Sequence, residues 1–323
     1  MSNRPIAAAL VAVCSLAATT GAAQTYPVKP VRIVVGFAPG GGVDMSARAV
    51  GKYLSDAIGQ QVIVDNRPGA AGNIGAAHVA KSPPDGYTLL MSNSTVSTPG
   101  LFVNLPFDIN KDLEPVSLVA IGPSVLVAHP SFPVKSVKDL IALARKRPGE
   151  ISYGSGGIGN ITHLEMEMVT SLTKTKMVHV PYKGSAPSIV GLTSGEVQVL
   201  FSSIPAALGQ VRAGRMRALA VSTLKRSSVL PDVPTIDESA LKGYDAASWY
   251  GLFMPAGAPK NAVARISGEV VKIMQAREIR ERFIADGFEP AGLTPDAFAK
   301  YLRAEIVKWD KVIKAAGIRP EGS

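Results

Sequence analysis

Two glycine clusters stand where an apolar strand gives way to a helical pattern. The first, GFAPGGG at residues 36–42, follows the apolar run 31–35. The second, GSGGIG at residues 154–159, follows a short predicted strand at 151–153. Such a turn leaves backbone N–H groups unpaired at the positive end of the helix dipole, where an anion binds without a charged side chain. Two such loops predict two lobes that face one small anion.

Small polar side chains close the third predicted strand, at residues 87–91. Ser92, Asn93, Ser94 and Thr95 follow one another there. Hydroxyls and amides at the carboxyl end of a strand could bond carboxylate oxygens directly. The same residue types also form helix N-caps, so both interpretations stay open at this stage.

The loops supply further candidates. Asp44 falls in the first turn of the helix after the first loop, where a carboxylate complements the dipole and a structural role fits well. His163 falls early in the helix after the second loop, where a place in the cleft and a capping or packing role are equally expected. With Gln198, discussed below, the candidate ligand-binding residues are Phe37, Ala38, Gly41, Gly42, Asp44, Ser92, Asn93, Ser94, Ser155, Gly157, Asn160 and His163.

The sequence lacks the motifs that nucleotide binding, hydrolysis and metal binding usually require. The second loop matches GxGxxG, but residues 178–183 carry no acidic side chain for a nucleotide ribose. No Gly-Lys-Ser/Thr follows either cluster, and neither GxSxG nor HExxH is present. The four histidines are not spaced as a metal pair. We therefore expect no catalytic residue, no metal and no cofactor, with an exported enzyme as the less favoured alternative.

Apolar runs alternate with helical patterns along almost the whole chain, which predicts parallel sheets covered by helices on both faces. The predicted strands are 31–36, 62–65, 87–91, 124–128, 151–153, 177–180, 197–201, 216–221 and 249–254. The predicted helices are 43–58, 72–80, 136–146, 160–172, 185–193, 204–213, 259–275, 278–285 and 294–316.

The length of 323 residues exceeds what one hydrophobic core usually serves, so we expect two α/β lobes. Chain crossings are predicted near 119–123 and 246–249, where they would serve as hinges beside a cleft at the carboxyl ends of the strands. The expected division is a signal peptide at 1–23, lobe 1 at 24–122 plus 248–323, and lobe 2 at 123–247.

The first 23 residues have the layout of a secretory signal peptide. Arg4 precedes an apolar stretch from 6 to about 18 and small residues at 21–23, so cleavage is expected before Gln24. The apolar stretch is too short for a membrane span, and a soluble periplasmic protein is predicted. The one cysteine, Cys14, lies inside this segment. A lipid anchor on it is disfavoured, because Val13 before it is not small.

Charge argues against nucleic acid as a partner. The formal net charge is +9, yet the cations are scattered and their densest run, residues 145–147, has no interleaved aromatics. A positive surface that attracts small anions fits the charge, and so does simple solubility. Hydrophobic residues make up 46% of the chain and charged residues 18%, which is ordinary globular composition.

Seven stretches, in order and spacing over nearly the whole chain after residue 25, resemble the Bug family, the extracytoplasmic receptors of tripartite tricarboxylate transporters. They are YPVKPVRIVVGFAPGGGVD at 26–44, DNRPGAAGNI at 65–74, PDGYTLL at 84–90, YGSGGIG at 153–159, VPYKGSAP at 180–187, LPDVPT at 230–235 and WYGLF at 249–253. Each motif alone is weak, but their ordered sum is specific.

The resemblance implies a type II, Venus-flytrap binding protein with a cleft between two doubly wound sheets. It also implies a small carboxylate ligand, gripped by the first glycine loop and the polar cluster at 92–95, partly through ordered water. The partners would be membrane permease subunits, and the receptor a monomer that hands over its ligand. A role as the ligand-sensing partner of a membrane sensor is the alternative function.

One position departs from the family pattern. Members often carry Asp in the strand equivalent to 197–201, where it pairs with an amino group on the ligand, and here Gln198 stands at that position. This predicts a plain carboxylate or a neutral-headed acid over an amino acid. The other interpretation is that Gln198 points into the second lobe and satisfies backbone groups.

Overall fold

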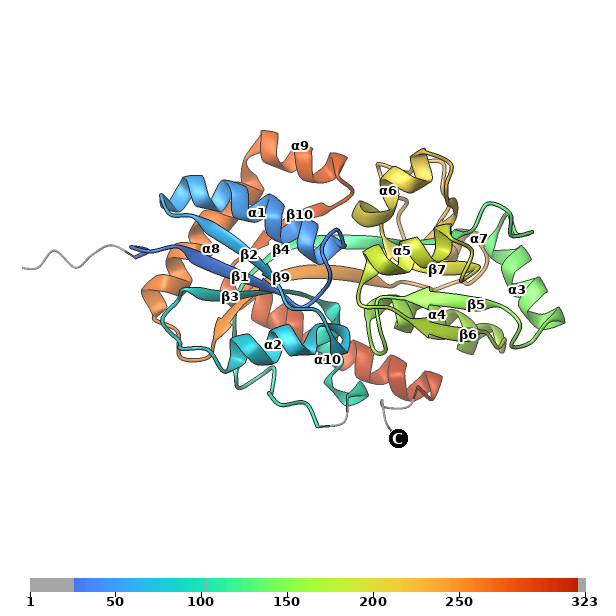
Figure 1. Cartoon of the computed structure of the whole chain (residues 1–323), viewed down its shortest axis with the longest axis horizontal. Coiled ribbons are helices and arrows are strands. Elements are labelled where there is room, and N and C mark those ends of the chain that lie inside the picture. Colours follow the sequence, from blue (N-terminus) through green and yellow to red (C-terminus); the bar gives the residue numbers. More distant parts are fainter. Residues whose placement is uncertain (1–25, 103, 319–323) are drawn as a thin grey trace, which may run out of the picture.

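Two α/β lobes lie side by side in the structure, a computed structural model that describes residues 26–102 and 104–318 (Figure 1). The predicted signal peptide and Cys14 lie outside the described residues. This two-lobe arrangement confirms the predicted fold class. Each lobe is a sheet with helices on both faces, and two strands run between the lobes (Figure 1).

Lobe 1 is built on six strands in the order β2-β1-β3-β9-β4-β10. They are β1 (Val31–Val35), β2 (Val62–Asn66), β3 (Thr88–Asn93), β4 (Leu113–Ala128), β9 (Ala247–Pro255) and β10 (Glu289–Leu293). Its helices are α1 (Gly42–Ile58), α2 (Asn73–Ala80), α8 (Lys260–Gln275), α9 (Arg277–Ala285) and α10 (Pro295–Ala316). Short 3-10 helices are η1 (Ala70–Gly72), η2 (Ser94–Ser97) and η3 (Pro99–Leu101).

Lobe 2 uses the end of β4 and four further strands in the order β8-β4-β7-β5-β6. They are β5 (Ser152–Ser155), β6 (Val178–Pro181), β7 (Val199–Ser203) and β8 (Arg217–Val221). Its helices are α3 (Val137–Lys146), α4 (Ile161–Thr173), α5 (Ser185–Thr193), α6 (Ile204–Arg212) and α7 (Ile236–Ser239).

Strand β4 belongs to both sheets. From Leu113 to Pro123 it pairs with β9, and from Ser124 to Ala128 with β7. The sequence predicted a strand only at 124–128, which is wrong by eleven residues at the start. Pro115 concealed the beginning of β4, because proline removes a ladder hydrogen bond; here it stands at a register shift in the pairing with β9.

The parallel strands of the two sheets point their carboxyl ends at each other. Strands β1, β2 and β3 are parallel in lobe 1, and β5, β6 and β7 are parallel in lobe 2. Because β4 and β9 join the lobes on one side, the outer strands β2 and β6 mark the mouth of the cleft. Residues that follow β3 and β7 lie near its floor.

Helix α1 shows how the pattern of residues sets an element. Val43, Ala47, Val50 and Leu54 recur at helical spacing and are buried against the sheet. Gly59 ends the helix in the left-handed conformation at φ 68°, which glycine adopts without strain. The spacing of apolar residues therefore sets the face of α1 that packs on the sheet, and the preceding strand β1 brings the N-terminus of the helix to the cleft.

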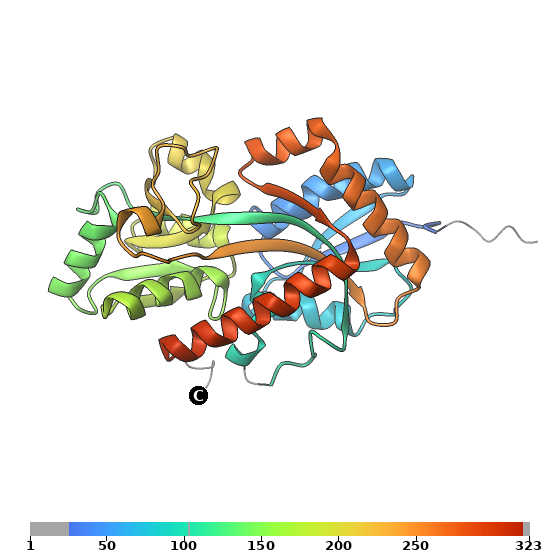
Figure 2. The ribbon, with the colours of Figure 1, turned by 180° about the vertical axis from the view of Figure 1, so that it is seen from behind.

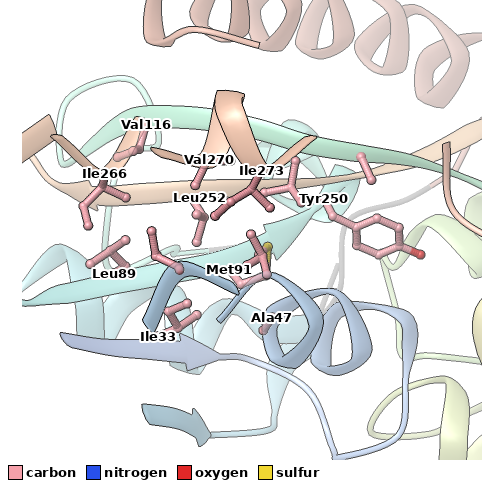
Figure 3. Packing of buried hydrophobic residues seen from close by; sticks show 14 of the residues in the cluster. Ile33, Ala47, Leu89, Met91, Val116, Tyr250, Leu252, Ile266, Val270 and Ile273 are labelled. Carbon is pink, nitrogen blue, oxygen red and sulfur yellow. The ribbon is translucent and has the colours of Figure 1, made fainter. Parts of the chain in front are cut away.

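The core under α1 and α8 reaches the hinge strand β9. Ile33 and Met91 from the strands meet Ala47 of α1 and Ile273 of α8 (Figure 3). At the edge of this cluster Tyr250 points its hydroxyl away from the apolar side chains, toward lobe 2 (Figure 3).

Helix α10 packs on both lobes. Its early residues Phe298 and Leu302 join a core with Trp249 of β9, whereas Trp309 and Ile313 join the core of lobe 2. Figure 2 shows the helix running from lobe 1 toward lobe 2. Among the described residues, no helix has the length and apolar character needed to cross a membrane.

We predict that Phe298→Ala lowers the free energy of unfolding by about 3–5 kcal/mol, because it removes a fully buried ring and leaves a cavity. The ring covers Gly251 of β9 so closely that a Cβ there would overlap it. Urea denaturation measures the change. Val307→Ala in the same helix is the control, since Val307 is 56% exposed and should change stability by no more than ~0.5 kcal/mol.

Candidate functional site

The first glycine loop is held in place by Asp44. Its carboxylate accepts hydrogen bonds from the Gly40 N–H at 2.9 Å, Arg48 Nε at 3.0 Å and Asn66 Nδ2 at 2.9 Å. Burial acts to raise the pKa of Asp44, but these partners together hold it below its usual value. Asp44, a candidate ligand residue, is therefore occupied within lobe 1 and positions the loop, as its alternative structural role anticipated.

Gly42, the first residue of α1, makes the closest approach to the rest of the site. A Cβ at this residue would overlap the Tyr250 hydroxyl and lie 2.7 Å from Ser203 Oγ. At Gly41 the nearest atoms to a Cβ would be 3.8 Å away, an ordinary contact distance. Of these two candidate residues, Gly42 is therefore the one that packs closely against Tyr250 and Ser203.

Neutral hydroxyl groups gather at the floor of the cleft beside Gly42. Ser94 Oγ, after β3, lies 3.3 Å from Ser248 Oγ of β9. Ser203 Oγ, at the end of β7, is buried without a hydrogen-bond partner in the described part of the chain. Burial raises the pKa of Tyr250, which keeps its phenol protonated. We call Ser94, Ser203, Ser248 and Tyr250 the hydroxyl cluster.

The polar residues at the end of β3 have different roles: one caps a helix and another lies at the floor of the cleft. Asn93 Oδ1 accepts the Thr95 N–H at 3.2 Å and caps η2, so the N-cap interpretation holds for this residue. Ser92 is buried in the last part of β3. Ser94 is the member that reaches the hydroxyl cluster.

The second glycine loop rests on two neutral histidines. Ser155 Oγ lies 2.6 Å from His179 Nε2 and accepts the Gly157 N–H at 3.1 Å. His163 Nδ1 accepts the Gly159 N–H at 3.2 Å, and the two imidazoles stack with centroids 4.1 Å apart. Burial lowers the pKa of His163 to about 3 and that of His179 to about 4.

Ser155 and His163 therefore support the loop from behind. Of the two roles expected for His163, the structure shows packing and hydrogen bonding to the loop backbone. Both side chains form hydrogen bonds within lobe 2, and neither lines the pocket at the mouth of the cleft.

The lobes touch across the cleft. The Ala38 N–H donates to Lys183 O at 3.2 Å, and Asn160 Nδ2 donates to Thr95 Oγ1 at 3.2 Å. Asn160 also caps α4, since its Oδ1 accepts the Thr162 N–H at 3.0 Å. Ala38 and Asn160, both candidate ligand residues, thus link the two lobes.

A pocket of about 200 Å³ lies at the mouth of the cleft. Phe37 and the loop 69–72 line it from lobe 1, and the loop 156–158 with Tyr182 lines it from lobe 2. Phe37 and Gly157 are the candidates that the structure places here. Gly157 has φ 125°, and a Cβ would lie 3.2 Å from Tyr182 O, so glycine is needed at this close approach.

The structure does not place the Gln198 side chain at the cleft. Its Oε1 accepts the Ser152 N–H at 2.7 Å, and its own N–H donates to Ser152 O at 3.0 Å. Ser152 begins β5, whereas the cleft loop follows the other end of that strand. Because β5 and β7 are parallel, Gln198 lies at the outer end of the lobe 2 sheet and satisfies backbone groups, as its alternative interpretation held.

Sequence reasoning missed three members of the hydroxyl cluster. Ser203 carried the same signal as Ser94, a small polar residue at the carboxyl end of a strand, and that signal was not applied to β7. Ser248 and Tyr250 gave no local signal, because they join the site only where β9 returns between the lobes.

The electrostatics of the cleft come from backbone and neutral groups, together with Lys183, which is the one charged residue among those that line the pocket. Helices α1, α4, α5 and α6 begin at loops that face the cleft, and their N-terminal dipole ends favour an anion. Among the described residues, no group of three or more His, Cys, Asp and Glu side chains is arranged to hold a metal.

Comparison with known proteins connects this geometry to a family. The family described as "Tripartite tricarboxylate transporter family receptor" matches residues 46–318. The protein BugT of Bordetella pertussis is 36% identical over 300 residues, covering 92% of each chain. The structure of the periplasmic binding protein BugD has a TM-score of 0.88 at 31% identity and covers 92% of this chain and all of that one.

Two solved relatives hold ligands. "R. palustris Rpa4515 with adipate" has a TM-score of 0.90 at 37% identity, covering 91% of this chain and 99% of that one. MatC (Rpa3494) from Rhodopseudomonas palustris, with bound malate, has a TM-score of 0.84 at 29% identity, covering 89% of this chain and all of that one. With a family match over most of its length, the chain belongs to the receptor family of tripartite tricarboxylate transporters.

Proposed function

We propose that this protein captures a small dicarboxylate between its lobes and delivers it to a membrane permease. The observation that carries the proposal is the hydroxyl cluster at the N-terminus of α1: it offers neutral donors and a positive helix dipole to an anion. The relatives with adipate and with malate both hold a dicarboxylate. The second carboxylate of the same ligand would lie at the N-terminal ends of the lobe 2 helices, across the cleft from α1.

In this proposal one carboxylate sits at Gly42 and the hydroxyl cluster, and the rest of the ligand extends toward the pocket at Phe37 and Gly157. Hydrogen bonds to a charged group contribute about 1.5–3 kcal/mol each. Those that Ser203 supplies from lobe 2 form only when the lobes close on Gly42 of lobe 1. Binding energy realised only in the closed form shifts the population toward closure.

We infer the position of the hinge from β4 and β9, the two strands that run between the lobes. We place lobe 1 at 24–122 plus 248–323 and lobe 2 at 123–247, because β4 passes between the sheets at Pro123 and β9 returns at Ala247. Helix α10 packs on the cores of both lobes, so movement between the lobes would change its contacts. We further propose that the chain is exported to the periplasm, acts as a monomer there and catalyses no reaction.

Titration calorimetry with adipate, malate, hexanoate and 2-aminoadipate tests the function. We expect one site per chain, with at least one of the two plain dicarboxylates binding tighter than hexanoate, because only a diacid engages helix N-termini on both sides. A protein that binds none of the four acids would contradict carboxylate capture.

Gly42→Ala should weaken dicarboxylate binding about tenfold or more, ~1.4 kcal/mol, because the added methyl displaces Tyr250 and Ser203. The matched control is Gly41→Ala, whose methyl has room and whose φ of −82° suits alanine. Calorimetry gives the affinities, and thermal unfolding without ligand checks that both variants fold. Equal affinities for the two variants would mean that Gly42 is not part of the site.

Gln198→Asp should leave ligand preference unchanged, because residue 198 lies at the outer end of the lobe 2 sheet. The affinity ratio of adipate to 2-aminoadipate, measured by calorimetry, should stay within about twofold of the wild-type value. Stability should fall, since the shorter side chain no longer reaches the Ser152 N–H. A shift toward the amino acid would restore Gln198 as a ligand residue.

A further inference from the structure

Glu165 has a buried carboxyl group that takes no part in the proposed ligand-binding site. It lies in α4 and is 0% exposed. Neither carboxyl oxygen has a hydrogen-bond partner within the described residues. An ionised carboxylate in such a place would be costly, so the group is favoured only in its protonated form.

The surroundings of Glu165 are the connections between the lobes. The Ser124 and Ser222 side chains act against the rise in the pKa of Glu165, although neither makes a hydrogen bond with its carboxyl group. Ser124 belongs to β4 just past the crossing, and its N–H donates to Ser222 Oγ at 3.0 Å. Ser222 donates in turn to the carbonyl of Ala246, immediately before β9. The carboxyl group therefore lies within the electrostatic reach of residues at which both hinge strands enter lobe 2.

The third connection, α10, contributes the one cation that acts on Glu165, Lys308. Burial raises the pKa of Glu165 to about 8, against the opposing effects of Ser124, Ser222 and Lys308. The other charged group of α10 nearby, Glu305, is bonded to Trp309 Nε1 at 3.1 Å and to Lys308 at 3.5 Å.

The remaining titratable neighbours stay neutral or lie outside. The Tyr244 hydroxyl donates to the Glu165 backbone carbonyl at 2.9 Å, and burial raises the pKa of both Tyr244 and Tyr250. Asp245 is exposed, and on α4 itself His163 is neutral while Glu167 accepts from the Tyr153 hydroxyl.

We propose that Glu165 is the proton-binding residue of the hinge, protonated when the lobes close on a carboxylate ligand, so that capture takes up a proton. The proposal rests on the proposed function. Because α10 packs on both lobes while α4 belongs to lobe 2, opening must shift α10 and the hinge strands against α4. That shift admits water to the carboxyl group, which then ionises as an ordinary glutamate does.

The direction of the pH effect follows from linkage. A hydrated glutamate ionises near pH ~4.3, so between about that pH and about 8 the closed form carries a proton that the open form lacks. Affinity should therefore fall as pH rises through this window, by up to about tenfold per unit. Above the window both forms are ionised, and affinity becomes independent of pH.

The test is calorimetry with adipate and malate at several pH values from 6.5 to above 8, in pairs of buffers that differ in ionisation enthalpy. The difference between paired buffers gives the number of protons bound with the ligand. For the wild type we expect close to one proton at the lowest pH and a decline above 8. Glu165→Gln should take up none and bind with an affinity that no longer changes with pH.

Glu269→Gln is the matched control: Glu269 is a partly buried glutamate of α8 in lobe 1, paired with Arg265 and Lys272, and the variant should behave as the wild type. Lys308→Met gives a second arm: losing the cation raises the pKa of Glu165, so the profile should move to higher pH. If Glu165→Gln does not fold, the pH profile of Lys308→Met tests the proton-binding role of Glu165. Normal binding without proton uptake, uptake that survives in Glu165→Gln, or an unmoved profile in Lys308→Met would overturn the proposal. Failure of every acid to bind would instead refute the proposed function.

Discussion

The structure depends on one shared hydrogen-bonded ladder. Strand β4 is 16 residues long and pairs with β9 in the first sheet and with β7 in the second. Because one strand serves both sheets, the carboxyl ends of the parallel strands must face each other across a fixed span. Every loop that follows these strands then opens into the same cleft.

The floor of the cleft beside Gly42 carries neutral donors in place of charged side chains. Asp44 is paired within lobe 1, His163 is neutral, and the groups beside Gly42 are hydroxyls and helix N-termini. Neutral donors cost less to bury than ammonium or guanidinium groups, so the empty site can close and open without a large desolvation penalty. The buried carboxyl group of Glu165 is the exception, and we propose a proton-binding role for it.

The elements of the fold were largely predictable, because hydrophobic spacing acts over short distances. The face of α1 at Val43, Ala47 and Val50 and the glycine that ends the helix are visible in the chain itself. The start of β4 was not, since Pro115 argues against a strand until β9 and β10 flank it. The candidate site was predictable only at the ends of parallel strands, where topology alone brings Gly42 and Ser94 to the cleft.

The sequence by itself determined most of the helices and strands, and it indicated two glycine loops at strand ends as candidate anion sites. It did so through local periodicity and backbone stereochemistry, which need no distant partner. The tertiary structure alone decided that Gln198 binds backbone at the outer end of its sheet and that Tyr250 lies over Gly42. The tertiary structure alone also placed Glu165 beside the three connections between the lobes, which are β4, β9 and α10. Such contacts join residues far apart in the chain, so only the packed lobes specify them.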